Sequence, residues 1–179
     1  TLAEDAHKKN GVFFDRGPVT ISSLRSKAKK MKITNGIEIL FIDHLGFIRS
    51  SGTHQNKHLE IDEVTKGLQA LAKELNIPIV CLAQLNRESA RRENKHPTLV
   101  DFRESGSIEE DADACILLHR PEYYNKAQKP GICEVNIAKN RIMGTLKTID
   151  FICHAQYSDK YYEQGESVEM IEPPKKKKF

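Results

Sequence analysis

Two short apolar runs on either side of a helical pattern constrain the fold of this chain more than any other feature. The runs occupy residues 37–42 and 79–83, and polar residues, Asp43 and Gln84, follow them. A nearly continuous apolar run is typical of a parallel strand that is covered on both faces. Residues 59–75 lie between the runs and carry apolar side chains at helical spacing. A strand, a helix and a strand in this order predict an α/β domain.

The other apolar patterns extend this architecture. The further expected elements are the end of a helix at residues 2–9, a strand at 12–14, a helix opened by Thr20 and ended by Asn35-Gly36, a short helix capped by Ser107 with Glu110, and strands at 115–118, 132–138 and 146–152. The last two strands alternate apolar and polar residues, which predicts an antiparallel hairpin that turns near residues 141–144. We therefore expect a mostly parallel sheet flanked by helices, with a late antiparallel hairpin.

Composition excludes several classes of protein. The chain has 179 residues, of which 39% are hydrophobic and 30% charged, so collagen, low-complexity disorder and a coiled coil do not fit. No apolar run approaches the roughly 20 residues that span a bilayer, and no signal-peptide pattern is present. The net charge of +3 is too small to establish a nucleic-acid partner. The first residue is Thr rather than Met, so we expect a processed or excerpted chain.

The four cysteines and seven histidines give no metal motif. Cys81, Cys115, Cys133 and Cys153 each lie in an apolar run, none of them in a C-x-x-C pair, and the histidines are scattered. This pattern predicts buried, reduced thiols in a cytoplasmic protein, and a zinc site is not expected without paired spacing.

The two strand-end residues are the first candidates for chemistry. Ligands gather at the carboxyl ends of strands in open α/β sheets. A carboxylate at Asp43 could hold the water shell of Mg²⁺ on a nucleotide, or it could simply cap the next turn. The Gln84 amide could contact a γ-phosphate or the attacking water, or it could be an ordinary polar residue that leaves the sheet.

Two later segments carry candidate basic residues. Residues 85–106 hold five Arg or Lys side chains, among them Arg87 and Arg103, against four acidic ones that include Glu104. Such a loop could follow a single-stranded backbone if several copies face one channel, or it could be a solvated surface loop. The helix start at Gly106 suits a phosphate or is only a capped turn. Lys139 and Arg141 lie on one face of the hairpin, where they could serve a neighbouring subunit's nucleotide or stay exposed.

Taken together, these segments resemble the DnaB-type replicative DNA helicases, in the later part of their RecA-like motor domain. The resemblance covers residues 12–162 and is carried by the stretches ILFIDHL, LAKELNIPIVCLAQLNRE, PTLVDFRESGSIEEDAD and NIAKNR, with TISSLRSKAKKM and RPEYYN. It implies a RecA-like fold over residues 1–165. The lysine-rich segment at 166–179 has no apolar pattern for packing, so we expect it to be a flexible tail. That tail could add DNA affinity, bind a loader or be a solvated end.

The resemblance also implies roles for individual residues. Asp43 matches the Walker B aspartate that supports Mg²⁺, and Gln84 matches the γ-phosphate sensor. Lys139 and Arg141 match basic residues that reach the ATP site of the adjacent subunit. The DNA-contacting residues implied are Arg87, Arg103, Glu104 and Gly106. The family forms homo-hexameric rings that use ATP to move 5′ to 3′ on single-stranded DNA, and helicase loaders and primase are further expected partners.

Three departures from the family pattern bear on activity. No G-x-x-x-x-G-K-[ST] motif occurs in the chain, so we expect a fragment or a degenerate copy, and little ATP turnover by the chain alone. His44 and Gly46 replace the usual Tyr and Gln, which predicts looser packing after Asp43. The stretch KNRIMGTL lacks the family's Asn-Gly-Pro-Thr, which predicts a shorter hairpin tip.

Two other functions stay open from the sequence. A RecA-like recombination or repair ATPase shares the aspartate and sensor positions. A non-catalytic module, either a degenerate ring subunit or a loader-binding partner, fits the missing phosphate loop.

Overall fold

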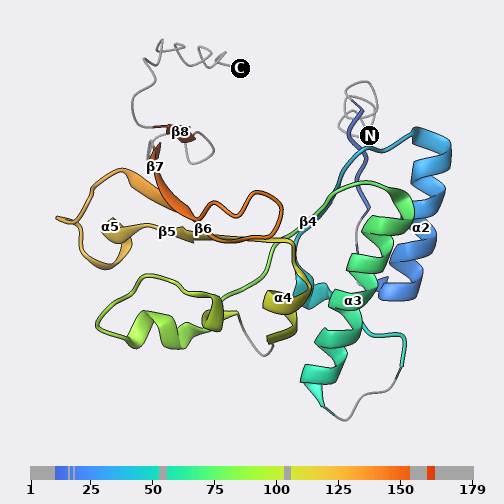
Figure 1. The fold of residues 1–179 in the computed structure, drawn as a ribbon, viewed down its shortest axis with the longest axis horizontal. Coiled ribbons are helices and arrows are strands. Elements are labelled where there is room, and N and C mark those ends of the chain that lie inside the picture. Colours follow the sequence, from blue (N-terminus) through green and yellow to red (C-terminus); the bar gives the residue numbers. More distant parts are fainter. Residues whose placement is uncertain are drawn as a thin grey trace, which may run out of the picture. The chain divides into compact units, whose positions relative to one another are not determined.

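The computed structural model describes residues 11–15, 17, 19–52, 56–102, 106–153 and 161–163. The chain divides into two compact units, one of residues 1–86 and 102–112 and one of residues 87–101 and 113–179 (Figure 1). The expected helix end at residues 2–9 and the lysine-rich tail lie outside the described residues, as do Arg103 and Glu104.

Both long helices of the first unit begin and end where local sequence signals place them. Helix α2 (Ile21–Asn35) has a capping box at Thr20, whose hydroxyl accepts a hydrogen bond from the Ser23 amide, and Gly36 closes it in a left-handed conformation. Helix α3 (Lys57–Leu75) is capped by Asn56 and ends at a left-handed Asn76. The sequence predictions of these two helices are confirmed.

The core of the first unit lies between these helices and the strands. Figure 1 shows α2 and α3 side by side. Two clusters of buried side chains lie along them, one formed by Ile21, Ile48, Val64 and Leu68 and the other by Ala28, Leu71, Leu75 and Ile77. Gly67 permits the close approach of α3 to α2, because a Cβ atom there would lie 2.4 Å from Ile21 Cγ1.

The strands of the first unit pair in parallel but are shorter than predicted. Strand β1 (Val19–Thr20) pairs with β3 (Ile48–Arg49), and β2 (Leu40–Ile42) pairs with β4 (Ile79–Cys81). The expectation of burial on both faces is wrong for the described residues, since Phe41 is 65% exposed. Helices α2 and α3 pack against one face of the β2–β4 pair. Within the described residues, no other element covers the opposite face, where Phe41 lies.

Two smaller predictions about the first unit are also wrong. Residues 12–14 form no strand, and Val12 and Phe14 are exposed, so this short apolar run adds nothing to the buried core of the described residues. Helix α4 (Gly106–Asp111) begins before Ser107, which therefore lies inside the helix and not at its cap. Asp111 fastens α4 to α3, because its carboxylate accepts a 2.6 Å hydrogen bond from the Thr65 hydroxyl.

The second unit is built on a four-stranded antiparallel sheet in the order β5-β6-β7-β8. Its elements are β5 (Ala114–His119), α5 (Pro121–Tyr124), β6 (Ile132–Asn140), β7 (Lys147–Cys153) and β8 (Tyr161–Glu163), preceded by 3₁₀ helices at Arg87–Arg91 and Leu99–Asp101. The predicted late hairpin is confirmed as β6 and β7. The strand expected at 115–118 is present, but it pairs antiparallel with β6, and its alternating burial fits a sheet with one covered face. Parallel strands, flanking helices and the hairpin together confirm the α/β class.

The cysteines behave as the sequence predicted. None of the four forms a disulfide, and Cys115, Cys133 and Cys153 are buried. Cys81 is half-buried, and burial raises the pKa of its thiol to about 12. Among the described residues, every helix is too short or too polar to cross a membrane.

Candidate functional site

Asp43 and Gln84 lie beyond the carboxyl ends of two paired parallel strands. Leu40 lies opposite Ile79, and Ile42 lies opposite Cys81. The ladder continues past the strands, because the Leu82 amide donates to the Ile42 carbonyl at 2.9 Å. Asp43 directly follows β2 and Gln84 comes three residues after β4, and both residues are exposed. The first unit thus brings a carboxylate position and an amide position to one edge of a parallel pair, as the sequence analysis required.

Local contacts between side chains and backbone hold the turn after Asp43. His44 Nδ1 accepts a hydrogen bond from the Gly46 amide at 3.1 Å, and the His44 ring lies 4.5 Å from the Phe47 ring. A Cβ atom on Gly46 would lie 2.8 Å from His44 Cε1, so the glycine makes room for the imidazole. His44 and Gly46 therefore form a matched pair at this turn.

The segment after Gln84 has more structure than the expected irregular loop. Arg87 begins a 3₁₀ helix, and Arg92 pairs with the buried Asp101 at 2.5 Å. Burial disfavours the charged form of Asp101, but hydrogen bonds from Thr98 and Arg92 outweigh it and hold the pKa of Asp101 below its usual range. An ion pair and hydrogen bonds thus fix the shape of this segment within the second unit.

The other predicted site residues are placed as follows. Gly106 is exposed at the start of α4. Lys139 lies in β6 opposite Cys115 and is half-buried. Arg141 lies in the hairpin turn, where its amide donates to the Asp113 carbonyl at 2.8 Å and its guanidinium lies 4.0 Å from the Asp113 carboxylate. Lys139 and Arg141 belong to the second unit, and Asp43, Gln84 and Gly106 belong to the first.

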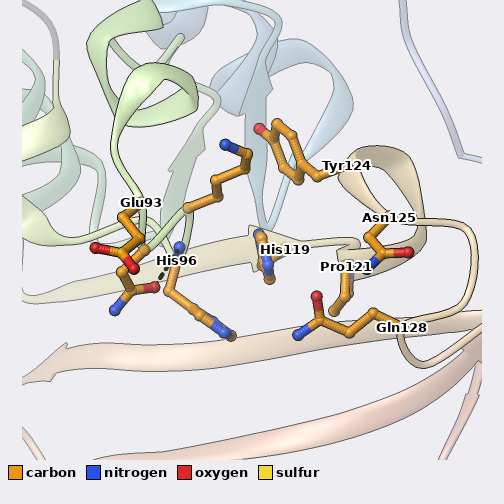
Figure 2. Close-up of a pocket in the computed structure, with 9 residues that line it drawn as sticks. Glu93, His96, His119, Pro121, Tyr124, Asn125 and Gln128 are labelled. Atoms are coloured by element: carbon orange, nitrogen blue, oxygen red, sulfur yellow. Dashed lines mark hydrogen bonds between the residues drawn. The ribbon is translucent and has the colours of Figure 1, made fainter.

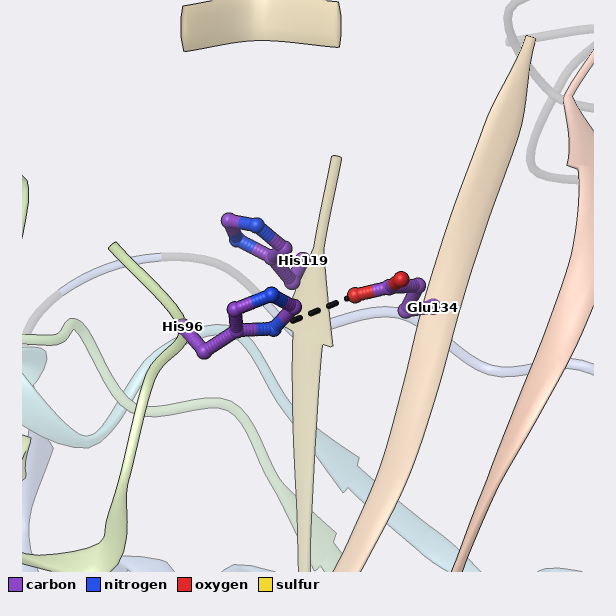
Figure 3. A group of neighbouring side chains, drawn as sticks. All are labelled: His96, His119 and Glu134. Atoms are coloured by element: carbon purple, nitrogen blue, oxygen red, sulfur yellow. Dashed lines mark ion pairs between the residues drawn. The ribbon is translucent and has the colours of Figure 1, made fainter. Parts of the chain in front are cut away.

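A cluster that the sequence analysis missed lies in the second unit. His96, His119 and Glu134 bring one ligand atom each to within 4.8 Å of one another. His119 lies directly opposite Glu134 in the antiparallel pairing of β5 with β6, and His96 approaches from the segment before β5 (Figure 3). Burial lowers the pKa of His119, and the neighbouring His96 adds to this effect. The signal in the sequence was the alternation of β5, which puts His119 on the same face as the buried Cys115 and Leu117.

A polar pocket of about 290 Å³ adjoins the cluster (Figure 2). Its lining residues are Glu93, Asn94, Lys95, His96, His119, Pro121, Tyr124, Asn125 and Gln128. The two histidines therefore face a space that is open to small solutes.

Solved structures with the same architecture define the class of this protein. One is a DnaB-like replicative helicase described with its interactions with primase, which matches with a TM-score of 0.78 and 31% identity over 84% of this chain and 36% of that one. Another is a separately solved ATPase domain, with a TM-score of 0.78 and 30% identity over 84% of this chain and 54% of that one. The fold is thus that of the RecA-like ATPases.

The chain belongs to the DnaB-like helicase C-terminal domain family, whose sequence model matches residues 2–162. The replicative DNA helicase DnaB of Geobacillus stearothermophilus is 37% identical over 161 residues, which cover 88% of this chain and 35% of that relative. DnaB of Rickettsia bellii is 47% identical over 119 residues, 66% of this chain and 24% of the relative. The chain therefore spans about a quarter to a third of the length of these curated relatives, and the resemblance found in the sequence is confirmed.

Proposed function

We propose that this chain is the C-terminal part of the motor of a replicative DNA helicase. The full enzyme uses ATP to move 5′ to 3′ along single-stranded DNA and unwinds duplex at the replication fork. The observation that carries the proposal is the parallel pairing of β2 with β4, which delivers Asp43 and Gln84 to one edge of the sheet. Family membership supports it, because the matched relatives are named replicative helicases.

The exposed residues at this edge fit a magnesium nucleotide. Mg²⁺ prefers carboxylate oxygens and keeps several waters, and the Asp43 carboxylate is accessible to such a hydrated ion. We assign Asp43 to the support of Mg²⁺ and Gln84 to sensing the γ-phosphate. Bound MgATP supplies the free energy of hydrolysis. Since the sequence has no phosphate-loop lysine motif, we assign the remaining phosphate contacts to residues outside these 179.

The hairpin provides a candidate contact between subunits. We assign Lys139 and Arg141 to the ATP site of the next subunit in a homo-hexamer. The guanidinium of Arg141 lies half exposed on a turn, 4.0 Å from the exposed Asp113 carboxylate, and surface pairs of this kind are weak.

Single-stranded DNA is the proposed substrate of the loops. We assign its backbone contacts to Arg87, Arg103, Glu104 and Gly106, which meet phosphates rather than base edges. Binding should therefore weaken as salt rises and tolerate changes of sequence. A helicase loader and primase are proposed partners, and the cytoplasm is the proposed location.

The nucleotide assignment is tested in a chain joined to the phosphate-binding half of such a motor. Asp43→Ala should abolish Mg²⁺-dependent ATP hydrolysis, whereas Glu38→Ala, which removes an exposed carboxylate shortly before β2, should leave it unchanged. Arg141→Ala should spare nucleotide binding and lower turnover by about 10³-fold or more if it acts in trans. Wild-type turnover by Asp43→Ala would refute the assignment. The 179-residue chain alone should show no turnover above background.

Unwinding separates the proposed function from its alternatives. The names of the relatives favour a helicase over a recombination ATPase. A helicase should open a forked duplex and fail in strand exchange, and the reverse result would support the recombination enzyme. If neither activity appears once the phosphate-binding half is supplied, the chain is a non-catalytic ring or loader-binding module.

A further inference from the structure

We propose that His96, His119 and Glu134 form a binding site for a divalent transition metal of the zinc class. The proposal concerns the second unit alone, and it does not depend on the assignment of the nucleotide site. It rests on the geometry of three side chains, on a buried carboxylate oxygen that accepts no hydrogen bond among the described residues, and on the pocket beside them.

The three ligand atoms are close to the arrangement that zinc requires. Ligands at 2.0–2.1 Å from a tetrahedral ion are separated by about 3.3 Å. His96 Nδ1 and Glu134 Oε2 are already 3.2 Å apart, and the third ligand atom lies within 4.8 Å of both. Metal binding would have to rotate the side chains and draw the third atom in, since the His96 and His119 rings now face each other at 4.3 Å. Two imidazoles with one carboxylate are a donor set that zinc accepts.

The buried carboxylate oxygen Oε2 of Glu134 accepts no hydrogen bond within the described part of the chain. Glu134 is 5% exposed, and its Oε2 atom lies 3.2 Å from Nδ1 of the half-exposed His96 (Figure 3). That contact is an ion pair only when His96 is protonated, and a neutral His96 leaves the oxygen without a counter-charge. Burying such an oxygen without a donor is costly. A cation between Oε2 and the imidazole nitrogens removes that cost.

The other carboxylate oxygen holds Glu134 in place for this role. Lys129 Nζ donates to Glu134 Oε1 at 2.7 Å and to Asp150 at 2.9 Å. Two carboxylates and one ammonium leave a net negative charge near the site, which favours a dication. Lys129 is thus a positioning residue, comparable to the outer partners that orient metal ligands elsewhere.

The strands and the pocket provide rigidity and access. His119 and Glu134 are cross-strand neighbours in β5 and β6, so the sheet fixes their separation. His96 comes from the segment before β5 and is half exposed, next to the pocket of about 290 Å³. Water from that pocket can fill a fourth coordination position. A metal here would fasten the segment of His96 to the sheet.

Metal titration of the chelator-treated chain tests the proposal. Co²⁺, followed by its visible absorption, and Zn²⁺, followed by calorimetry, should each bind at one equivalent per chain at neutral pH, and Zn²⁺ should displace Co²⁺. His96→Ala and Glu134→Gln should weaken binding by about 100-fold or more, since loss of an outer partner alone costs 10–100-fold. His58→Ala removes an exposed histidine at the start of α3 and should change nothing. His96→Cys should restore binding.

Each variant must be shown to fold before a loss of metal binding is interpreted. His96 is half exposed, so His96→Ala should fold, and circular dichroism of each variant verifies this. If Glu134→Gln fails to fold, His96→Ala carries the test. Absence of Zn²⁺ binding at micromolar concentration, equal affinity in His96→Ala, or loss of binding in His58→Ala would each overturn the proposal.

Discussion

The hydrogen bond between Thr65 and Asp111 should be one of the main contacts that hold α4 against α3. Thr65 is 8% exposed, and its hydroxyl donates to Asp111 Oδ2 at 2.6 Å. Thr65→Val keeps the shape of the side chain and nearly the same helix propensity but removes this donor. Hydrogen bonds to charged groups contribute about 1.5–3 kcal/mol, and the partly exposed Asp111 recovers some of this from water. We therefore expect a loss of about 1–2 kcal/mol in the free energy of unfolding.

Urea unfolding followed by far-ultraviolet circular dichroism measures this loss, since the chain has no tryptophan. With a slope of about 2 kcal/mol/M, the midpoint should fall by about 0.5–1 M. Thr34→Val is the matched control, because Thr34 lies on an exposed face of α2, and it should change stability by less than about 0.5 kcal/mol.

A double-mutant cycle decides whether the hydrogen bond is the cause. Thr65→Val and Asp111→Ala should couple by about 1–2 kcal/mol, since each removes the same interaction. A coupling near zero, or equal losses in Thr65→Val and Thr34→Val, would show that the reasoning is wrong. Because α4 begins at Gly106, the same variants also test whether its attachment affects the proposed contact with DNA.

Two further predictions concern packing and pH. Gly67→Ala should destabilise the chain by about 1–2 kcal/mol in urea unfolding, because the clash with Ile21 exceeds the gain in helix propensity. Gly106→Ala should be neutral or stabilising, because its Cβ atom would meet only an ordinary contact, Glu110 Oε1 at 4.0 Å. A more stable Gly67→Ala would contradict the close approach. Asp101 accepts three hydrogen bonds and has a lowered pKa, so its contribution is full above the unfolded value of about 4 and is lost as pH falls through the folded value. Asp101→Asn should lower the free energy of unfolding by about 1–3 kcal/mol at pH 7. Below about pH 4 the stability of this variant should fall less steeply with pH than that of the wild type, and the same pH dependence in both proteins would refute this.

Local signals explain which parts of the fold the sequence predicted. Thr20 and Gly36 mark both ends of α2 because capping depends only on neighbouring residues. The β6–β7 hairpin follows from period-two alternation and a turn with a left-handed Gly144. Neighbouring residues alone determine where these elements begin and end, so they could be predicted without knowledge of tertiary contacts.

Exposure and pairing direction were harder to predict. The apolar run that contains Phe41 indicates a strand, but it cannot say whether a second layer covers both faces. Likewise, the run at Cys115 predicts a strand without telling whether its neighbour is parallel or antiparallel. Both properties depend on residues far away in the chain.

The candidate sites differ in the same way. Asp43 and Gln84 could be paired from the sequence because parallel strand ends meet at one edge. The cluster of His96, His119 and Glu134 could not, since its members lie in three segments and meet only through the register of β5 and β6. That register places His119 opposite Glu134, which no local pattern encodes.

The burial of the cysteines has a practical consequence for labelling. Maleimides and disulfide reagents react with the thiolate, and both Cys81 and Cys133 have thiol pKa values that burial raises. Met143, in contrast, is exposed in the hairpin turn. A dye on Met143→Cys would therefore report on the hairpin with all four native thiols left in place.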